Sequence, residues 1–137
     1  MKIVHCSTSV SHSSANYRIH RVLLEKGVNS KILVLNKNND RLESVYQIGE
    51  YGLKYKLYQK IAYYLNIFEF IFLDKVMKLQ KGMPFTLGIT GIDISKIQVI
   101  QDADIIHLHC VNASYLSLKG IKKLINLGKP LVITLHD

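Results

Sequence analysis

The sequence predicts a Rossmann-like open α/β fold, with about four or five parallel strands and helices on both faces of the sheet. Short apolar runs typical of buried strands alternate with segments whose apolar residues have helical spacing. A strand, a helix and a second strand follow one another within the first 35 residues. This βαβ order requires parallel strands and a right-handed crossover. Residues 1–137 are expected to form a single domain around one core.

The first βαβ unit begins with residues 2–6 (KIVHC) and ends with residues 30–35 (SKILVL), both typical of buried strands. Between them, a hydroxyl-rich loop at 7–14 (STSVSHSS) leads into a helix. One of the last two serines of that loop is expected to cap the helix, and Gly27 is expected to end it. The helix positions expected to face the sheet are Ala15, Ile19, Val22 and Leu23.

The middle of the chain is expected to be mainly helical. A short strand is expected at 45–48, and helical spacing of apolar residues runs from about Tyr51 to Leu79. The expected buried face of this helix carries Leu57, Ile61, Tyr64, Leu65, Phe68, Ile71 and Phe72. Residues 81–90 (KGMPFTLGIT) contain Gly and Pro and are expected to be loop, and 93–102 to hold a short helix.

The last third repeats the order of strand, helix and strand. Residues 104–109 (DIIHLH) and 131–136 (LVITLH) are the expected strands. Between them, Ser114 is a suitable helix cap, Gly128 ends the helix and Pro130 prevents its continuation. The inward positions of this helix are expected to be Leu118, Ile121, Leu124 and Ile125.

Composition limits the class of protein and its partners. Hydrophobic residues make up 48% and charged residues 20%, which is typical of a globular chain. A net charge of +8 favours anionic partners, or else reflects a lysine-rich solvated surface. Cys6 and Cys110 stand at strand ends and are expected to be buried thiols. Without a signal peptide or an apolar run of ~18–20 residues, the expected location is the cytoplasm.

The candidate site lies where the predicted strands end, because ligands of open α/β sheets bind beyond the carboxyl ends of the strands. Those ends carry His5-Cys6, His109-Cys110 and His136-Asp137. The loop 7–14 precedes a helix N-terminus, which favours anions such as phosphate. The loop lacks the glycines of a GxGxxG fingerprint or a P-loop, so neither a dinucleotide-binding fold nor an NTPase is supported.

Three histidines raise the alternative of a metal site. His107 and His109 point the same way on a strand, and His136 ends the neighbouring one. No carboxylate or further histidine stands at a convincing ligand spacing, so no metal is expected. Helices cover both faces of such a sheet, so His107 is expected to be a hydrogen-bonded core residue, with His109 and His136 at the rim.

The segment 51–60 (YGLKYKLYQK) interleaves aromatic and basic residues. Such a segment can stack on nucleic acid, lie in a lipid interface, or be the solvated face of a helix. No nucleic-acid-binding motif is present, so nucleic acid is not an expected partner. The alternative function is therefore a non-catalytic binding module that docks on an anionic membrane surface or a partner protein.

Three stretches in a fixed order carry a resemblance to a known family. They are KIVHCSTSVSHSSANYRIHRVLLEKGVNSKILVL, FTLGITGIDISKIQVIQDADIIHLHCVNASYLSLKGIKKL and KPLVITLHD. Together they resemble the N-terminal, acceptor-side domain of glycosyltransferase family 4 enzymes, which have the GT-B architecture of two Rossmann-like domains. The combination of ADIIHLH, SLKGIKKL and KPLVITLHD in this order is more specific than any one of them.

The resemblance implies transfer of a sugar from a nucleotide-sugar donor to a glycan or lipid-linked acceptor, in synthesis of a surface polysaccharide or lipopolysaccharide. It implies a retaining reaction without metal or other cofactor. By motif position, His136 would be the catalytic residue that reaches the donor sugar. The implied substrate-binding residues are Ser11, His12, Ser13, His109, Asn112 and Asp137.

Two departures from the family pattern concern this site. Serines and His12 stand where the family often has consecutive glycines, and Cys110 stands where it often has Trp. The family also continues beyond a TLHD-like motif into a nucleotide-binding domain. The expectation is therefore a partial, truncated member, with an incomplete sheet relative to the family. It is expected to be inactive alone and to work with a C-terminal transferase half, and peripheral contact with the inner face of a membrane is a further expectation.

Overall fold

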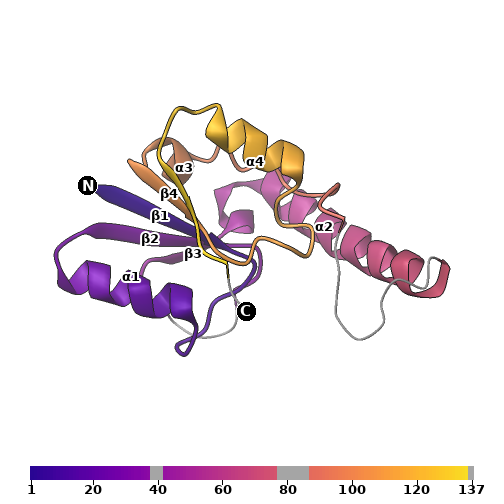
Figure 1. Ribbon diagram of the computed structural model, residues 1–137, viewed down its shortest axis with the longest axis horizontal. Coiled ribbons are helices and arrows are strands. Elements are labelled where there is room, and N and C mark those ends of the chain that lie inside the picture. Colours follow the sequence, from indigo (N-terminus) through magenta and orange to yellow (C-terminus); the bar gives the residue numbers. More distant parts are fainter. Residues whose placement is uncertain (38–41, 77–86, 136–137) are drawn as a thin grey trace.

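The computed structural model describes residues 1–37, 42–76 and 87–135, which form a five-stranded sheet (Figure 1). The strand order is β3-β2-β1-β4-β5, and each adjacent pair is parallel. The strands are β1 (Lys2–Ser7), β2 (Asn29–Val34), β3 (Val45–Gln47), β4 (Ile105–Leu108) and β5 (Leu131–Ile133). The predicted Rossmann-like open α/β sheet is confirmed.

Helices cover both faces of this sheet, as predicted. They are α1 (Ala15–Glu25), α2 (Leu53–Ile71), α3 (Gln98–Gln101) and α4 (Leu118–Ile125), with a 3₁₀ turn η1 (Ile48–Tyr51) before α2 and a π-helical turn η2 (Phe72–Val76) after it. Helix α1 lies on one face, and α3, α4 and the start of α2 lie on the other (Figure 1). Gly27 and Gly128, at φ +74° and +69°, take the left-handed conformation that ends helices α1 and α4.

Alternation along the strands divides the core into two layers. One face of β1 and β4 carries Val4, Cys6, Ile106 and Leu108, which belong to the larger core cluster. This cluster also includes Ala62 of α2, Ile100 of α3 and Leu124 of α4. The smaller cluster lies under α1 and contains Val10, Tyr17, Ile32, Val34, Leu42 and Val45. Strands buried on both faces explain why the predicted strands appear as continuous apolar runs.

The prediction of which face of α1 is buried was wrong. Ile19 and Val22 are 37% and 53% exposed, whereas the buried residues of α1 are Asn16, Tyr17 and His20. His20 contacts the Ser30 hydroxyl at 2.7 Å and the Glu43 carbonyl at 3.1 Å, both from its ring nitrogens. Polar contacts with the sheet therefore set the rotation of α1, which a purely apolar periodicity does not reveal.

Helix α2 also departs from its predicted packing. Of its residues only Ala62 is buried, while Tyr64 and Phe68 of the predicted buried face are 69% and 66% exposed. The helix extends beyond the edge of the sheet (Figure 1), so the apolar face of its outer half has no sheet beneath it. Within the described residues, no helix is both long and apolar enough to cross a membrane.

The start of α4 differs from the prediction as well. Ser117, rather than Ser114, is the N-cap, and its hydroxyl accepts the Gly120 N–H at 3.1 Å. Ser114 has φ +59° and its hydroxyl lies 2.7 Å from that of Thr90. The first turn of α4 therefore begins three residues later than predicted. This shift leaves Leu118 70% exposed.

Gly91 marks a close approach between the segment before α3 and the start of α4. A Cβ at Gly91 would lie 2.1 Å from the Ser117 nitrogen and 2.5 Å from the Leu116 carbonyl carbon. We expect Gly91→Ala to lower the free energy of unfolding by about 1–3 kcal/mol, because the backbone of α4 has to move.

Gly120→Ala is the matched control, since its Cβ would meet nothing closer than 3.5 Å. Replacing a helical glycine there is expected to stabilise the protein by up to ~1 kcal/mol. Urea denaturation measures both variants. Equal stabilities of the two variants would contradict the close approach.

Candidate functional site

The loops that follow β1 and β4 are joined by hydrogen bonds at the carboxyl edge of the sheet. The Thr8 N–H donates to the Cys110 carbonyl at 2.7 Å. The Thr8 hydroxyl lies 2.9 Å from the same carbonyl, and 3.1 and 3.2 Å from the two oxygens of Asn112. The His109 N–H also donates to the Cys6 carbonyl at 2.9 Å. The two loops therefore form one continuous rim.

A small cavity of about 180 Å³ opens beside this rim. Its lining residues are Ser7, Ser9, Ser14, Ala15, Asn16, His109 and Cys110. The N-terminus of α1 borders the cavity at Ala15 and Asn16. A helix N-terminus carries a partial positive charge, so this side of the cavity favours negatively charged groups. The volume lies below the ~300–1,000 Å³ of pockets for drug-sized ligands, so the cavity suits one sugar ring or a phosphate group. Larger hollows of about 360 and 570 Å³ lie along α2 instead.

The hydroxyl-rich loop of residues 7–14, called the serine loop below, is stabilised by hydrogen bonds of its own side chains. Ser14 occupies the N-cap position of α1 but makes no side-chain cap bond. Its hydroxyl donates to the Ser11 carbonyl at 2.7 Å and accepts the Ser11 N–H at 3.2 Å. The hydroxyls of Ser11 and Ser13 are 3.2 Å apart. Because Ser14 bonds back into the loop, its hydroxyl does not cap the N–H groups of the first turn of α1.

The structure brings only some of the predicted site residues to the cavity. His109 lines it, whereas Ser11, His12 and Ser13 lie further along the loop and do not. His12 is exposed and its ring meets that of Tyr17 edge-on at 5.4 Å. Asn112 is exposed next to Thr8. The predicted catalytic residue His136 and its neighbour Asp137 lie outside the described residues.

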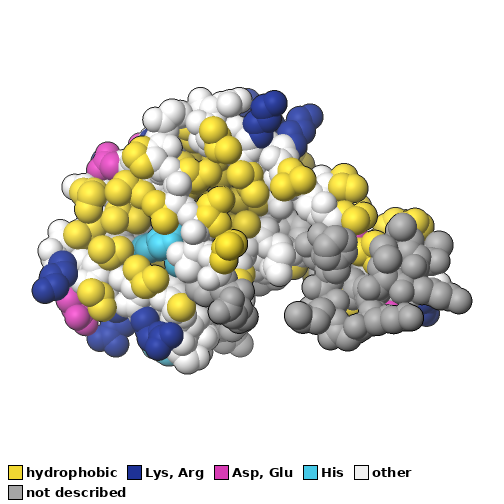
Figure 2. Space-filling view, viewed as in Figure 1, with side chains coloured by type: hydrophobic (Ala, Val, Ile, Leu, Met, Phe, Trp, Pro, Cys, Tyr) yellow, Lys and Arg dark blue, Asp and Glu magenta, His cyan; other side chains and the backbone are white. Residues whose placement is uncertain are grey.

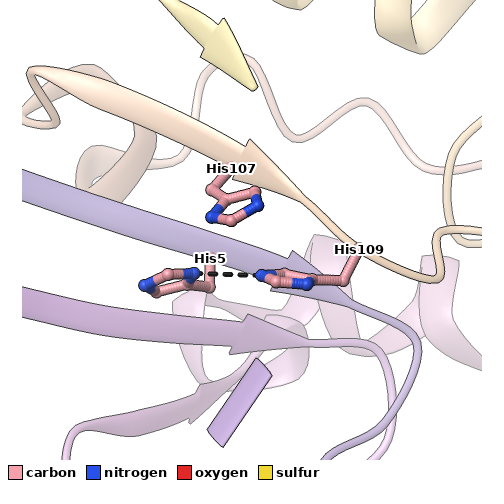
Figure 3. Close-up of side chains that lie close together, drawn as sticks. All are labelled: His5, His107 and His109. Atoms are coloured by element: carbon pink, nitrogen blue, oxygen red, sulfur yellow. Dashed lines mark hydrogen bonds between the residues drawn. The ribbon is translucent and has the colours of Figure 1, made fainter. Parts of the chain in front are cut away.

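Three histidines gather behind this rim (Figure 3). The register of β1 and β4 pairs His5 with His107, and His109 follows two residues later. The His5 Nδ1 lies 3.0 Å from the His109 Nε2. The ring centroids are 5.0 Å apart for His5 and His107, 5.3 Å for His5 and His109, and 4.1 Å for His107 and His109.

The burial of these histidines reverses the prediction. His109, expected at the rim, is only 4% exposed, and His5, not predicted as a site residue, is fully buried. His107, expected in the core, is half-buried and lies 2.7 Å from the Thr134 hydroxyl. Helix α1 lies over β2 and β1, so the face near β4 and β5 stays partly open (Figure 1). Figure 2 shows histidine at the surface there, among apolar side chains.

One signal in the sequence could have revealed the role of His5. It stands on the first predicted strand, and parallel pairing with the HxH strand places all three imidazoles on one face. Among the described residues, His5, His107 and His109 each offer a nitrogen, and these atoms lie within 4.8 Å of one another. Their spacing is that of a group that could hold a metal ion, whereas His136, which the alternative set of the sequence analysis included, lies outside the described residues.

Burial controls the ionisation of this region. It lowers the pKa of His5 from 6.5 to about 3, with smaller contributions from His107, His109 and His20, so His5 is neutral at pH 7. Burial raises the pKa of the Cys6 thiol to about 12, so Cys6 is protonated and is not a nucleophile. Cys110 is exposed, which corrects the prediction that both thiols are buried.

Compared with family models, curated proteins and solved structures, the chain matches none. The fold and the site define its class: an open parallel α/β domain with a small serine-lined cavity and a histidine cluster at the carboxyl edge of its central strands.

The depressed pKa of His5 predicts loss of stability in acid. Between pH 6.5 and about 3 the unfolded chain binds a proton on this residue that the folded chain does not. Stability from this source is therefore complete above pH 6.5 and falls as the pH approaches 3. At pH 4.5 the loss should be on the order of 2 kcal/mol.

Urea denaturation in chelator at pH 7.5 and 4.5 tests this prediction. The wild type is expected to lose more stability between the two pH values than His5→Gln, in which the titrating group is absent. His12→Gln removes an exposed histidine and is expected to follow the wild type. The same loss in His5→Gln and the wild type would show that another group carries the acid sensitivity.

Proposed function

We propose that the chain is the acceptor-side domain of a nucleotide-sugar-dependent glycosyltransferase. The observation that carries the proposal is the cavity at the carboxyl edge, lined by serines of the loop after β1, the N-terminus of α1 and His109. The order of motifs that resembles the family 4 enzymes adds support. In the reaction, a bond forms between an acceptor oxygen and the anomeric carbon of the donor sugar, and the bond from that carbon to the phosphate oxygen breaks. The nucleoside diphosphate leaves with the bonding electrons and takes up the proton that the acceptor hydroxyl loses.

The groups that line the cavity suit a sugar. Ser7, Ser9 and Ser14 have hydroxyls that both donate and accept hydrogen bonds, as sugar hydroxyls do. The cavity has room for one ring and not for a nucleotide as well, so the nucleotide is held elsewhere, in a second domain of the kind that the resemblance implies. The N-terminus of α1 favours the negative charge of a donor phosphate approaching the cavity.

Direct sugar binding is the first test. Saturation-transfer NMR with a panel of methyl glycosides is expected to show transfer from the protein to the sugar ring. Ser9 is exposed and lines the cavity, so Ser9→Trp should fill it and reduce the signal at least several-fold. Asn126→Trp places the same side chain at the exposed end of α4 and is expected to leave the signal unchanged. Equal signals in both variants would exclude the cavity as the sugar site.

Transfer itself is expected only when a nucleotide-binding domain is supplied. The chain, incubated with nucleotide-sugars and glycan acceptors, is expected to transfer sugar with such a domain and not without it. His136→Ala should reduce transfer by about 10²-fold or more, the usual effect of losing one transition-state contact. Full activity of this variant would remove the assignment of His136, and transfer by the chain alone would remove the need for a second domain.

A second candidate function is docking on an anionic membrane surface, and helix α2 favours it. Its exposed apolar side chains include Tyr63, Tyr64, Phe68, Phe70 and Ile71. The N-terminal half of the helix adds Lys54, Lys56 and Lys60, all exposed. A helix with exposed aromatic and basic residues that does not span the bilayer suits the lipid interface.

Vesicle binding tests the docking proposal. The chain is expected to bind phosphatidylcholine vesicles that contain phosphatidylglycerol, more weakly at high salt, and not phosphatidylcholine alone. Changing both Lys56 and Lys60 to Gln should cost about 2 kcal/mol, roughly 30-fold in affinity. The same change at Lys119 and Lys122 on α4 removes the same net charge from a different helix and is the control. Equal effects of the two pairs would mean that overall charge, not α2, attracts the vesicles.

A further inference from the structure

We propose that His5, His107 and His109 form a binding site for one divalent transition-metal ion of the Zn²⁺ class. The three imidazoles come from two central strands and the turn that follows β4 (Figure 3). One nitrogen from each lies within 4.8 Å of the others. Imidazole nitrogens suit zinc, cobalt, nickel and copper ions, whereas magnesium and calcium prefer oxygen. The proposal does not depend on sugar transfer, although His109 also lines the cavity.

The distances fit a shared ion. Two imidazole nitrogens bound tetrahedrally to zinc at ~2.0–2.1 Å lie about 3.3 Å from each other. The His5 Nδ1 and the His109 Nε2 are already 3.0 Å apart. The widest spacing in the group, within 4.8 Å, has to shorten to about 3.3 Å, and we expect rotation of an imidazole about its side-chain bonds to supply this change.

Hydrogen bonding among the protein groups does not satisfy both ring nitrogens of His5. The contact between His5 and His109 requires one hydrogen between two nitrogens, and a metal ion takes the place of that hydrogen. The His5 Nε2 is buried and is the one buried side-chain nitrogen or oxygen of the described residues without a hydrogen-bond partner. An unsatisfied buried polar atom costs about 1–3 kcal/mol, so a purely structural role accounts poorly for this histidine. An ion on Nδ1 would fix the hydrogen of His5 on Nε2 and would not itself give that nitrogen a partner, so the support for the ion comes from the Nδ1 side, where the two imidazoles face each other.

The surroundings both support the site and leave it accessible. Central strands hold His5 and His107, and a backbone bond from His109 to the Cys6 carbonyl, 2.9 Å long, fixes the turn. The Thr134 hydroxyl, 2.7 Å from the His107 Nε2, orients that ring as outer partners orient ligating histidines. His107 is half-buried on the partly open face, which gives an ion a path to the site. A water molecule or a small ligand would complete a tetrahedral set.

Cobalt titration tests the site, because tetrahedral Co²⁺ absorbs visible light strongly. The full chain, stripped of metal by chelator, is expected to bind one Co²⁺ and to release it to Zn²⁺. His107→Gln should weaken binding at least ~100-fold, since it removes one of three ligands. His12→Gln and Cys110→Ser remove an exposed histidine and an exposed thiol outside the cluster and are expected to keep wild-type affinity. Unchanged binding in His107→Gln, or loss in either control, would overturn the proposal.

Thermal unfolding gives a readout that separates binding from misfolding. His107 is chosen because it is half-buried, and its variant is expected to unfold cooperatively in chelator. Zinc should raise the Tm of the wild type by several degrees and leave that of His107→Gln unchanged, since an ion that binds only the folded state stabilises it. An equal increase in both proteins would show that zinc binds elsewhere, and no increase in either would also contradict the site.

Discussion

The parallel register between β1 and β4 is the constraint on which the rest of the structure depends. Lys2 and Asp104 fix it at one end, where the Lys2 N–H donates to the Asp104 carboxylate at 2.6 Å and the Asp104 N–H donates to the Lys2 carbonyl at 2.8 Å. From there His5 faces His107, and Thr8 reaches the loop that follows β4. A shift by one residue would turn His107 to the opposite face and separate the cluster. The cavity and the histidine cluster are thus consequences of one pairing.

Different interactions stabilise the two faces of the sheet: apolar packing on one face, and hydrogen bonds together with apolar packing beneath α1 on the other. Opposite α1, the core is almost wholly apolar, and alternation of Val, Ile, Leu and Cys determines which side chains point inward. Beneath α1, His20 and Asn16 are buried and make hydrogen bonds to Ser30 and to the carbonyls of Ser9 and Glu43. Hydrogen bonds are directional, so they fix the rotation of α1 more strictly than apolar contact does.

This difference explains what could be predicted from sequence. All five strands were predictable as short segments bounded by turn residues, most clearly β1 and β2, which are apolar runs buried along most of their length. Strand β5, at the edge of the sheet, is an apolar run that is half-buried to exposed. The rotation of α1 and the buried face of α2 could not be predicted. The first depends on the polar groups beneath α1, and the second depends on how far the sheet extends under α2. For the site, the meeting of the serine loop with His109 was predictable from the topology rule. The burial of His5 could not be predicted, because it depends on the register between β1 and β4 and on how much of the sheet α1 covers.

The histidine cluster lies on the α1 side of the sheet, where aliphatic side chains would be the simplest way to fill the space. Ile32 and Val34 show that aliphatic side chains fit beside it, and they would leave no polar atom without a partner. Placing imidazoles there instead gives up apolar contact and leaves the His5 Nε2 unsatisfied. Sequences tend to depart from local packing rules at sites that bind or react. The two central strands and the loops that follow them carry this departure together with the wall of the cavity. His109 belongs to both, so the proposed metal site and the proposed sugar site share a single imidazole.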